Sequence, residues 1–135
     1  MAERHFTPEE ANELLDRVRP VAESLVAHPR AFTVAAARRA RLAQRISGNG
    51  GDFDPQEPGE LDEELQREAE AVARAVEELQ GLGVLVKDLD RGLVDFPALR
   101  EGEEVLLCWQ VGEDEVAYWH GLEEGFAGRK PLPLD

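Results

Sequence analysis

The chain has 135 residues, with 29 acidic residues against 15 lysines and arginines and a formal net charge of -14. This length suits one domain with a modest core, and a field of this sign argues against nucleic acid and membrane surfaces as partners. No apolar run approaches the length of a membrane span and the first residues lack the apolar segment of a secretory signal. The single Cys108 cannot form an intramolecular disulfide, so we expect a cytoplasmic protein.

The first predicted element is a helix that begins at the sequence FTPEE. Thr7 fits the N-cap, Pro8 the first helical position and Glu10 the third, which together form a capping box. Apolar residues then recur at three- and four-residue spacing up to residue 26, which predicts one buried stripe. Pro20 lies within this pattern and removes the hydrogen bond to the carbonyl of Asp16, so we expect it to kink or break the helix.

A second helix is predicted over residues 30–47, beyond His28 and Pro29. Residues 1–47 contain eight arginines and six acids, whereas residues 48–135 contain seven bases and 23 acids. One side of this helix carries Arg38, Arg41 and Arg45 at three- and four-residue spacing. A nucleic-acid-binding stripe is one interpretation. Pairing with the acidic helix that follows, within the chain or between subunits, also explains the charge asymmetry and is the simpler interpretation.

Residues 48–60 hold four glycines and two prolines and are predicted to form a flexible loop. The next helix is predicted over residues 61–82, where apolar side chains recur at nearly heptad spacing. This length supports a long antiparallel hairpin or a short coiled coil rather than a fibrous rod. Gly83 is expected to end the helix.

Beyond residue 83 the pattern becomes β-rich, and about four short antiparallel strands are predicted over residues 84–120. Turns are expected at residues 90–92 and 112–114. If the second hairpin pairs Val111 with Val116, the other pairs are Trp109 with Tyr118, Leu107 with His120 and, on the opposite face, Cys108 with Trp119. This register places Cys108 and His120 on opposite faces of the sheet.

Together these patterns predict an α+β fold in a single domain, residues 1–135. It consists of a long antiparallel helical hairpin of two to three helices, a small antiparallel sheet and an extended C-terminal arm over residues 121–135. We expect Phe126 to anchor the arm in the core, the glycines to turn the chain, and Arg129 to pair with an acid.

Two parts of the chain resemble a known family. Residues 6–20, FTPEEANELLDRVRP, and residues 83–132, which include GLVDFP, the Cys108-Trp109 pair and WHGLEEGFAGR, are similar to an uncharacterised bacterial family catalogued as domain of unknown function 2203. The family pattern has an acid three residues after the histidine, where this chain has Glu123. It also has an acid directly after the histidine, where this chain has Gly121 instead. The resemblance implies a fold and a bacterial origin but no activity.

A divalent metal site is the first candidate for chemistry. His120 and Glu123, in an H-x-x-E arrangement, offer an imidazole and a carboxylate, and Asp95 from the other hairpin offers a third ligand. The spacing is a weak signal, because His5 and His28 are distant in sequence. The simpler interpretation is that His120 only closes the end of a strand and forms a hydrogen bond with the turn. A third interpretation is that His120 acts as a catalytic base.

The sequence GFAGR offers a candidate anion site. Backbone N–H groups at Gly125 and Gly128 could form a nest, to which Arg129 adds a fork for carboxylate or phosphate. The alternative is that this stretch only turns the arm. The three aromatic residues Trp109, Tyr118 and Trp119 offer a stacking surface for a planar ligand or, more simply, core packing.

Two functional hypotheses follow. The first is a non-catalytic cytoplasmic bacterial protein that acts through helix-mediated self-association, as a homodimer, or through a protein partner, with no cofactor. The second is a small metal- or anion-binding protein or enzyme centred on His120, Glu123, Asp95 and Arg129. Nucleic-acid binding through the arginine-rich helix ranks last.

Overall fold

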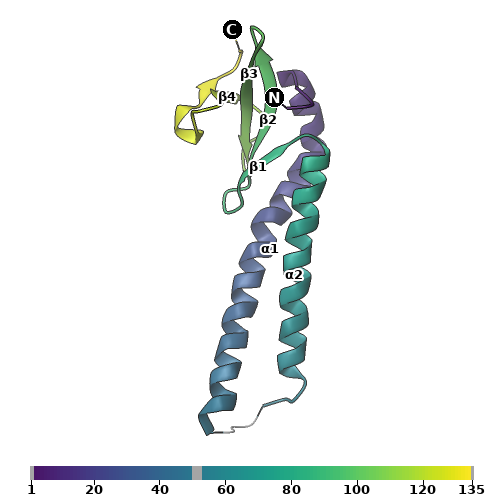
Figure 1. The fold of residues 1–135 in the computed structure, drawn as a ribbon, viewed down its shortest axis with the longest axis vertical. Helices are drawn as coiled ribbons and strands as arrows, with labels where there is room; N and C mark the ends of the chain where they lie inside the picture. The colour runs from purple at the N-terminus through teal and green to yellow at the C-terminus, as the bar shows by residue number, and fades with distance from the viewer. Residues whose placement is uncertain (1, 50–52, 135) are drawn as a thin grey trace.

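The computed structural model describes residues 2–49 and 53–134. Two long helices, α1 (Pro8–Asn49) and α2 (Glu57–Gly81), form an antiparallel hairpin, and a five-stranded antiparallel sheet lies at one end of it (Figure 1). The strands follow one another in the order β1 (Leu85–Asp88), β2 (Leu93–Arg100), β3 (Glu103–Gln110), β4 (Tyr118–Gly121) and β5 (Lys130–Pro131). This arrangement confirms the predicted α+β class, in which a helical hairpin precedes a small sheet.

Helix α1 begins as predicted and is longer than predicted. The backbone N–H of Thr7 donates to Oε1 of Glu10 at 2.9 Å, and the N–H of Glu10 donates to Oγ1 of Thr7 at 3.1 Å. Of the predicted kink or break at Pro20, the break is wrong, and so is the predicted start of a second helix at residue 30, because one helix of 42 residues runs through Pro20 and Pro29. Side chains on both sides of Pro20 are fully buried in the core, namely Val18, Ala22 and Leu25. This packing outweighs the loss of one backbone hydrogen bond.

Helix α2 begins one turn before its predicted start. The carbonyl of Asp54 accepts the N–H of Glu57, and Pro58 stands in the first turn, where its missing N–H costs nothing. The predicted loop therefore loses residues at both ends, and its residues 50–52 lie outside the described part of the chain. At the other end Leu82 caps the helix and Gly83 turns the chain with φ 88°, as predicted.

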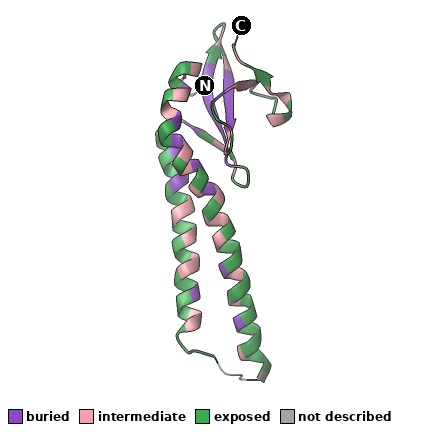
Figure 2. Ribbon diagram, turned by 180° about the vertical axis from the view of Figure 1, so that it is seen from behind, coloured by how far each residue is buried: buried purple, intermediate pink, exposed green. Residues whose placement is uncertain are grey.

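The two helices carry opposite charges that face each other. Three arginine–carboxylate ion pairs connect them: Arg39 with Asp62 at 2.9 Å, Arg38 with Glu64 at 4.0 Å and Arg45 with Glu57 at 3.9 Å. Nδ1 of His28 also contacts the carboxylate of Glu68. The predicted charge pairing between the helices is therefore present within the chain. Burial is dense where the helices meet the sheet and sparse along the projecting hairpin (Figure 2).

The central strands form the longest pairing of the sheet. Strands β2 and β3 pair over eight residues, from Leu93 with Gln110 to Arg100 with Glu103. The predicted turn before β2 is confirmed, and it requires a glycine. Gly92 has φ 61°, and a Cβ at this position would lie 2.4 Å from Cγ2 of Val111.

The predicted register between β3 and β4 is wrong by one residue. The observed pairs are Cys108 with Tyr118, Leu107 with Trp119 and Leu106 with His120. Helix α1 causes the difference, because Oδ1 of Asn12 accepts the N–H of Val116 at 2.7 Å and Nδ2 of Asn12 donates to its carbonyl at 3.2 Å. Val116 thus belongs to the core beneath α1 and does not pair with Val111. A slip of one residue moves every side chain of the strand to the other face.

The sheet separates two environments. One face packs on the helices through Val94, Phe96, Ala98, Val105, Leu107 and Trp109. The 3-10 turn of the C-terminal segment lies away from the helices (Figure 1), whereas Leu132 and Leu134 at its end pack against the core. This segment contains a short 3-10 turn, Phe126–Gly128, and the added strand β5, so it is less extended than predicted. Phe126 is half-buried on this side and does not enter the core, which corrects its expected role as a core anchor.

Candidate metal centre

Three side chains that can bind a metal meet on the sheet face that the helices do not cover. Asp95 of β2, Cys108 of β3 and His120 of β4 are 1%, 0% and 4% exposed. One ligand atom of each lies within 4.8 Å of the others. The strand register produces this meeting. Asp95 of β2 pairs with Cys108 of β3, and His120 of β4 pairs with Leu106, which lies two residues before Cys108 and therefore on the same face of β3. The register predicted from the sequence would have placed Cys108 on the other face.

The hydrogen bonds of His120 orient its ring toward Asp95. Nδ1 lies 2.8 Å from the carbonyl oxygen of Gly121, and only a protonated Nδ1 can donate to a carbonyl. Nε2 lies 3.3 Å and 3.2 Å from the two carboxylate oxygens of Asp95. A backbone carbonyl that fixes the ring through its second nitrogen is the usual outer partner of a metal-binding histidine. The arrangement presents Nε2, the nitrogen free of the backbone, to the other two side chains.

Burial controls the protonation of the two acidic groups. It raises the pKa of the Asp95 carboxyl, while the neighbouring His120 opposes this shift. Burial, followed by the Asp95 charge, raises the pKa of the Cys108 thiol to about 12. The thiol is therefore protonated at neutral pH, and both nitrogens of His120 already have partners. A cysteine nucleophile activated by histidine does not fit this geometry.

The same geometry fits a divalent metal. Two nitrogen or oxygen ligands that each lie about 2.0–2.1 Å from a tetrahedral zinc are about 3.3 Å apart, close to the spacing between Nε2 and the Asp95 oxygens. A bound cation also removes the cost of burying the Asp95 charge and converts the Cys108 thiol to a thiolate. Nitrogen, oxygen and sulfur ligands in one set are typical of zinc-class ions.

A small cavity adjoins two of the three side chains. Its volume is about 130 Å³, and its lining combines Asp95 and His120 with apolar groups from β2, β3 and the C-terminal segment. Two charged side chains also line it, Lys87 from β1 and Glu124 from the C-terminal segment. The cluster is thus buried but not sealed.

The structure brings together two of the three predicted metal ligands, Asp95 and His120. It leaves Glu123 exposed and outside this group, whereas the next residue, Glu124, lines the cavity. Oε1 of Glu124 accepts the N–H of Gly121 at 2.8 Å and the Nζ of Lys130 at 2.6 Å. Sequence reasoning missed Cys108 as a member of the cluster because it depended on the hairpin register.

Some of the groups proposed for an anion nest are already paired. The N–H of Gly128 donates to the carbonyl of Gly125 at 2.9 Å within the 3-10 turn, and the N–H of Arg129 donates to Phe126. Nη2 of Arg129 donates to both carboxylate oxygens of Glu113, at 2.7 and 2.9 Å. These contacts occupy Nη2 of Arg129 and the N–H groups of Gly128 and Arg129, whereas Nε of Arg129 is buried and has no hydrogen-bond partner among the described residues. The predicted pairing of Arg129 with an acid is confirmed.

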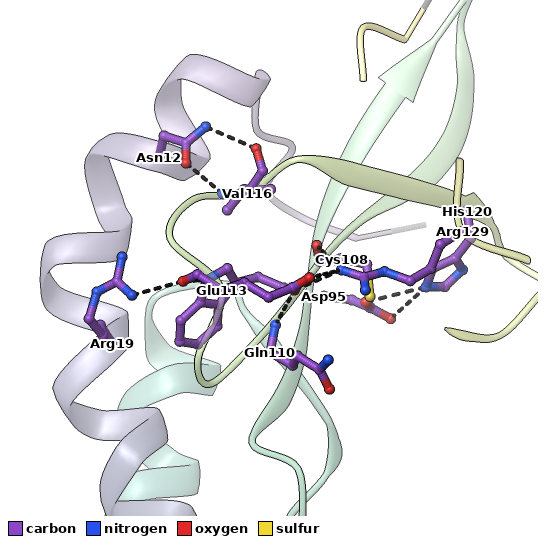
Figure 3. Close-up of polar contacts among 10 residues, drawn as sticks. Asn12, Arg19, Asp95, Cys108, Gln110, Glu113, Val116, His120 and Arg129 are labelled. Atoms are coloured by element: carbon purple, nitrogen blue, oxygen red, sulfur yellow. Dashed lines mark hydrogen bonds and ion pairs between the residues drawn. The ribbon is translucent and has the colours of Figure 1, made fainter. Parts of the chain in front are cut away.

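Arg129 instead connects the Asp-Cys-His cluster to the rest of the fold. Its guanidinium carbon lies 4.1 Å from the ring centre of Tyr118 and 4.5 Å from that of Phe126. Its partner Glu113 also accepts the backbone N–H of Gln110 through its carboxylate and a guanidinium bond from Arg19 through its carbonyl (Figure 3). This network ties helix α1, the β3–β4 connection and the strands behind Cys108 together.

Fold and site together define an α+β protein in which a helical hairpin supports a small sheet with a buried Asp-Cys-His cluster. A family model described as "Uncharacterized conserved protein (DUF2203)" matches residues 4–132. The chain therefore belongs to this family, as the sequence resemblance implied. Neither the curated proteins nor the solved structures contain a match. Among the described residues, no helix combines the length and the apolar character that crossing a membrane would require.

Proposed function

We propose that this protein binds one zinc-class divalent ion through Asp95, Cys108 and His120. The observation that supports this most strongly is the convergence of three buried ligand types, with Nδ1 of His120 donating to the Gly121 carbonyl at 2.8 Å. Packing alone does not require an acid, a thiol and an imidazole at adjoining positions of a small sheet. A bound cation would also offset the burial that raises the pKa of Asp95 despite its contact with His120. A reducing cytoplasm would keep Cys108 in the thiol form.

The test is the metal content of untagged protein, measured by mass spectrometry after purification without chelators. We expect about one metal ion per chain in the wild type and a loss of metal in Cys108→Ser and His120→Ala. Glu123→Gln serves as the matched control, because Glu123 is exposed and outside the cluster. Circular dichroism checks that each variant is folded. Wild-type protein that takes up neither zinc, manganese nor iron would overturn the proposal, as would equal metal in wild type and Cys108→Ser.

A second proposal concerns the projecting hairpin. Phe32 and Val34 of α1 are 38% and 61% exposed, and Arg41, close by on the same helix, forms no ion pair within the described residues. Helix α2 carries a surplus of acids. The two outer surfaces are thus complementary in charge, and a second copy packed antiparallel would place α1 of one chain against α2 of the other.

Light scattering at micromolar concentration tests self-association. We expect a dimer that dissociates at high salt and in the variant Val34→Glu. Thr33→Glu, on the same stretch of α1 and also exposed, controls for the added charge. A monomeric wild type at this concentration rejects the second proposal and leaves the metal proposal untouched.

A further inference from the structure

The cavity beside the cluster has the size of a very small ligand. At about 130 Å³ it holds roughly four water molecules at their liquid volume of about 30 Å³ each. Three of its lining residues are leucines, Leu93, Leu106 and Leu122, and Phe126 adds an aromatic wall. A ligand of a few non-hydrogen atoms with an apolar side therefore fits here, and the exposed Leu122 leaves the cavity open to solvent.

The cavity reaches the cluster at one edge. Asp95 and His120 line it, whereas Cys108 does not. Three protein ligands leave one position of a tetrahedral ion unfilled, which distinguishes reactive or ligand-binding sites from closed structural ones. Glu124 is not positioned as the fourth ligand. Its Oε1 accepts hydrogen bonds from the Gly121 N–H and the Lys130 Nζ, and its Oε2 lies beside Gly128.

The charge at the cavity favours an anion. Lys87 lines it and acts on the charge of Asp95, yet it forms no ion pair with an acid among residues 2–49 and 53–134. The other lysine, Lys130, neutralises Glu124 through a contact of 2.6 Å. A divalent ion would offset the charges of Asp95 and Cys108, and Lys130 offsets that of Glu124. The charge of Lys87 then remains, so the local charge at the cavity is positive.

We infer that the cavity binds a small carboxylate, of the size of acetate, as the fourth ligand of the ion held by Asp95, Cys108 and His120, with Lys87 attracting its charge. The inference rests on the proposed metal binding. The carboxylate would meet the ion through its oxygens and place its apolar end among the leucines and Phe126. This assigns the site to a small-molecule centre rather than to a structural metal, whose fourth ligand would be a protein group.

Cobalt-substituted protein tests metal binding and carboxylate binding separately. Co²⁺ replaces zinc in such sites, and its visible spectrum reports both the cysteine thiolate and the number of ligands. The experiment loads the full chain with Co²⁺ and then titrates it with sodium acetate. We expect a change in the visible bands with a dissociation constant in the millimolar range, because so small a ligand makes few contacts. Propionate extends the apolar end and should bind at least as well as acetate.

Lys87→Met is the decisive variant. It should load Co²⁺ as fully as the wild type and weaken acetate binding about three- to tenfold, as expected for the loss of one partly screened charge near the ligand. Arg67→Met, an exposed position of α2 outside the cavity, makes the same change in net charge and should bind acetate as the wild type does. Failure to load Co²⁺ rejects the proposed metal site. Full loading with no spectral response to acetate, or an equal response in Lys87→Met, rejects the carboxylate site alone.

Discussion

Zinc should stabilise the folded protein, and the effect should depend on Cys108. A ligand that binds only the folded state adds RT ln(1 + [L]/Kd), or about 4 kcal/mol when free zinc is about 1,000 times Kd. For a chain of this size about 1 kcal/mol corresponds to roughly 3–5 °C in Tm, so the expected shift is about 12–20 °C. Differential scanning fluorimetry of metal-free protein, with and without zinc, measures it.

Cys108→Ser tests the source of that stabilisation. Serine keeps a hydroxyl that can donate to Asp95 as the thiol does, so the metal-free variant should lie within about 1 kcal/mol of the wild type. With one ligand lost and affinity lowered about 100-fold, the same zinc concentration should add only about 1.4 kcal/mol, or roughly 4–7 °C. Glu123→Gln should retain the full shift. Equal shifts in wild type and Cys108→Ser would refute the assignment of Cys108 as a ligand.

Three further outcomes follow. Metal affinity should rise at least about tenfold per pH unit over roughly pH 6–8 and fall as the solution is acidified. The reason is that the Cys108 thiol, whose pKa is about 12 without metal, must lose its proton when the metal binds. A chelator competition series at several pH values measures the affinity, and an affinity that does not change with pH would contradict the prediction. Arg129→Met removes the bond to Glu113 and the contact with Tyr118 and should lower the free energy of unfolding in urea by about 2–4 kcal/mol; a loss below about 0.5 kcal/mol would show that the pair is not structural. Asn12→Ala leaves the backbone N–H and carbonyl of Val116 without their partners. It should lower the free energy of unfolding by about 1–3 kcal/mol and weaken zinc binding. Unchanged zinc binding would show that the register of β4 does not depend on Asn12.

The parts of the fold that local patterns determine were predictable. The capping box at Thr7 and Glu10 involves neighbours in sequence, and Gly83 and Gly92 stand where a turn needs positive φ. The absence of a break at Pro20 has a different origin. The cost of a proline in a helix is local, but the packing of Val18 and Leu25 against α2 and the sheet is not visible in the sequence of α1.

The candidate site was predictable only in part, for the same reason. Asp95 and His120 were chosen by residue type and by the expectation that two hairpins adjoin. The sequence pattern places Cys108 on the wrong face, because it favours a hairpin in which Val111 pairs with Val116 across the turn. The actual register depends on Asn12, which lies 104 residues away from Val116 in the chain.

The clamp between Asn12 and Val116 has a consequence for how the protein is made. The cluster needs Asp95, Cys108 and His120 on one face. His120 can join it only after synthesis has passed residue 120 and Val116 has met Asn12 in the second turn of α1. Contacts of such sequence separation form late, because a large loop must close before they stabilise anything. A ribosome-bound chain that stops short of β4 therefore lacks one of the three proposed ligands, and metal uptake would report that the N-terminal and C-terminal parts of the polypeptide have come together.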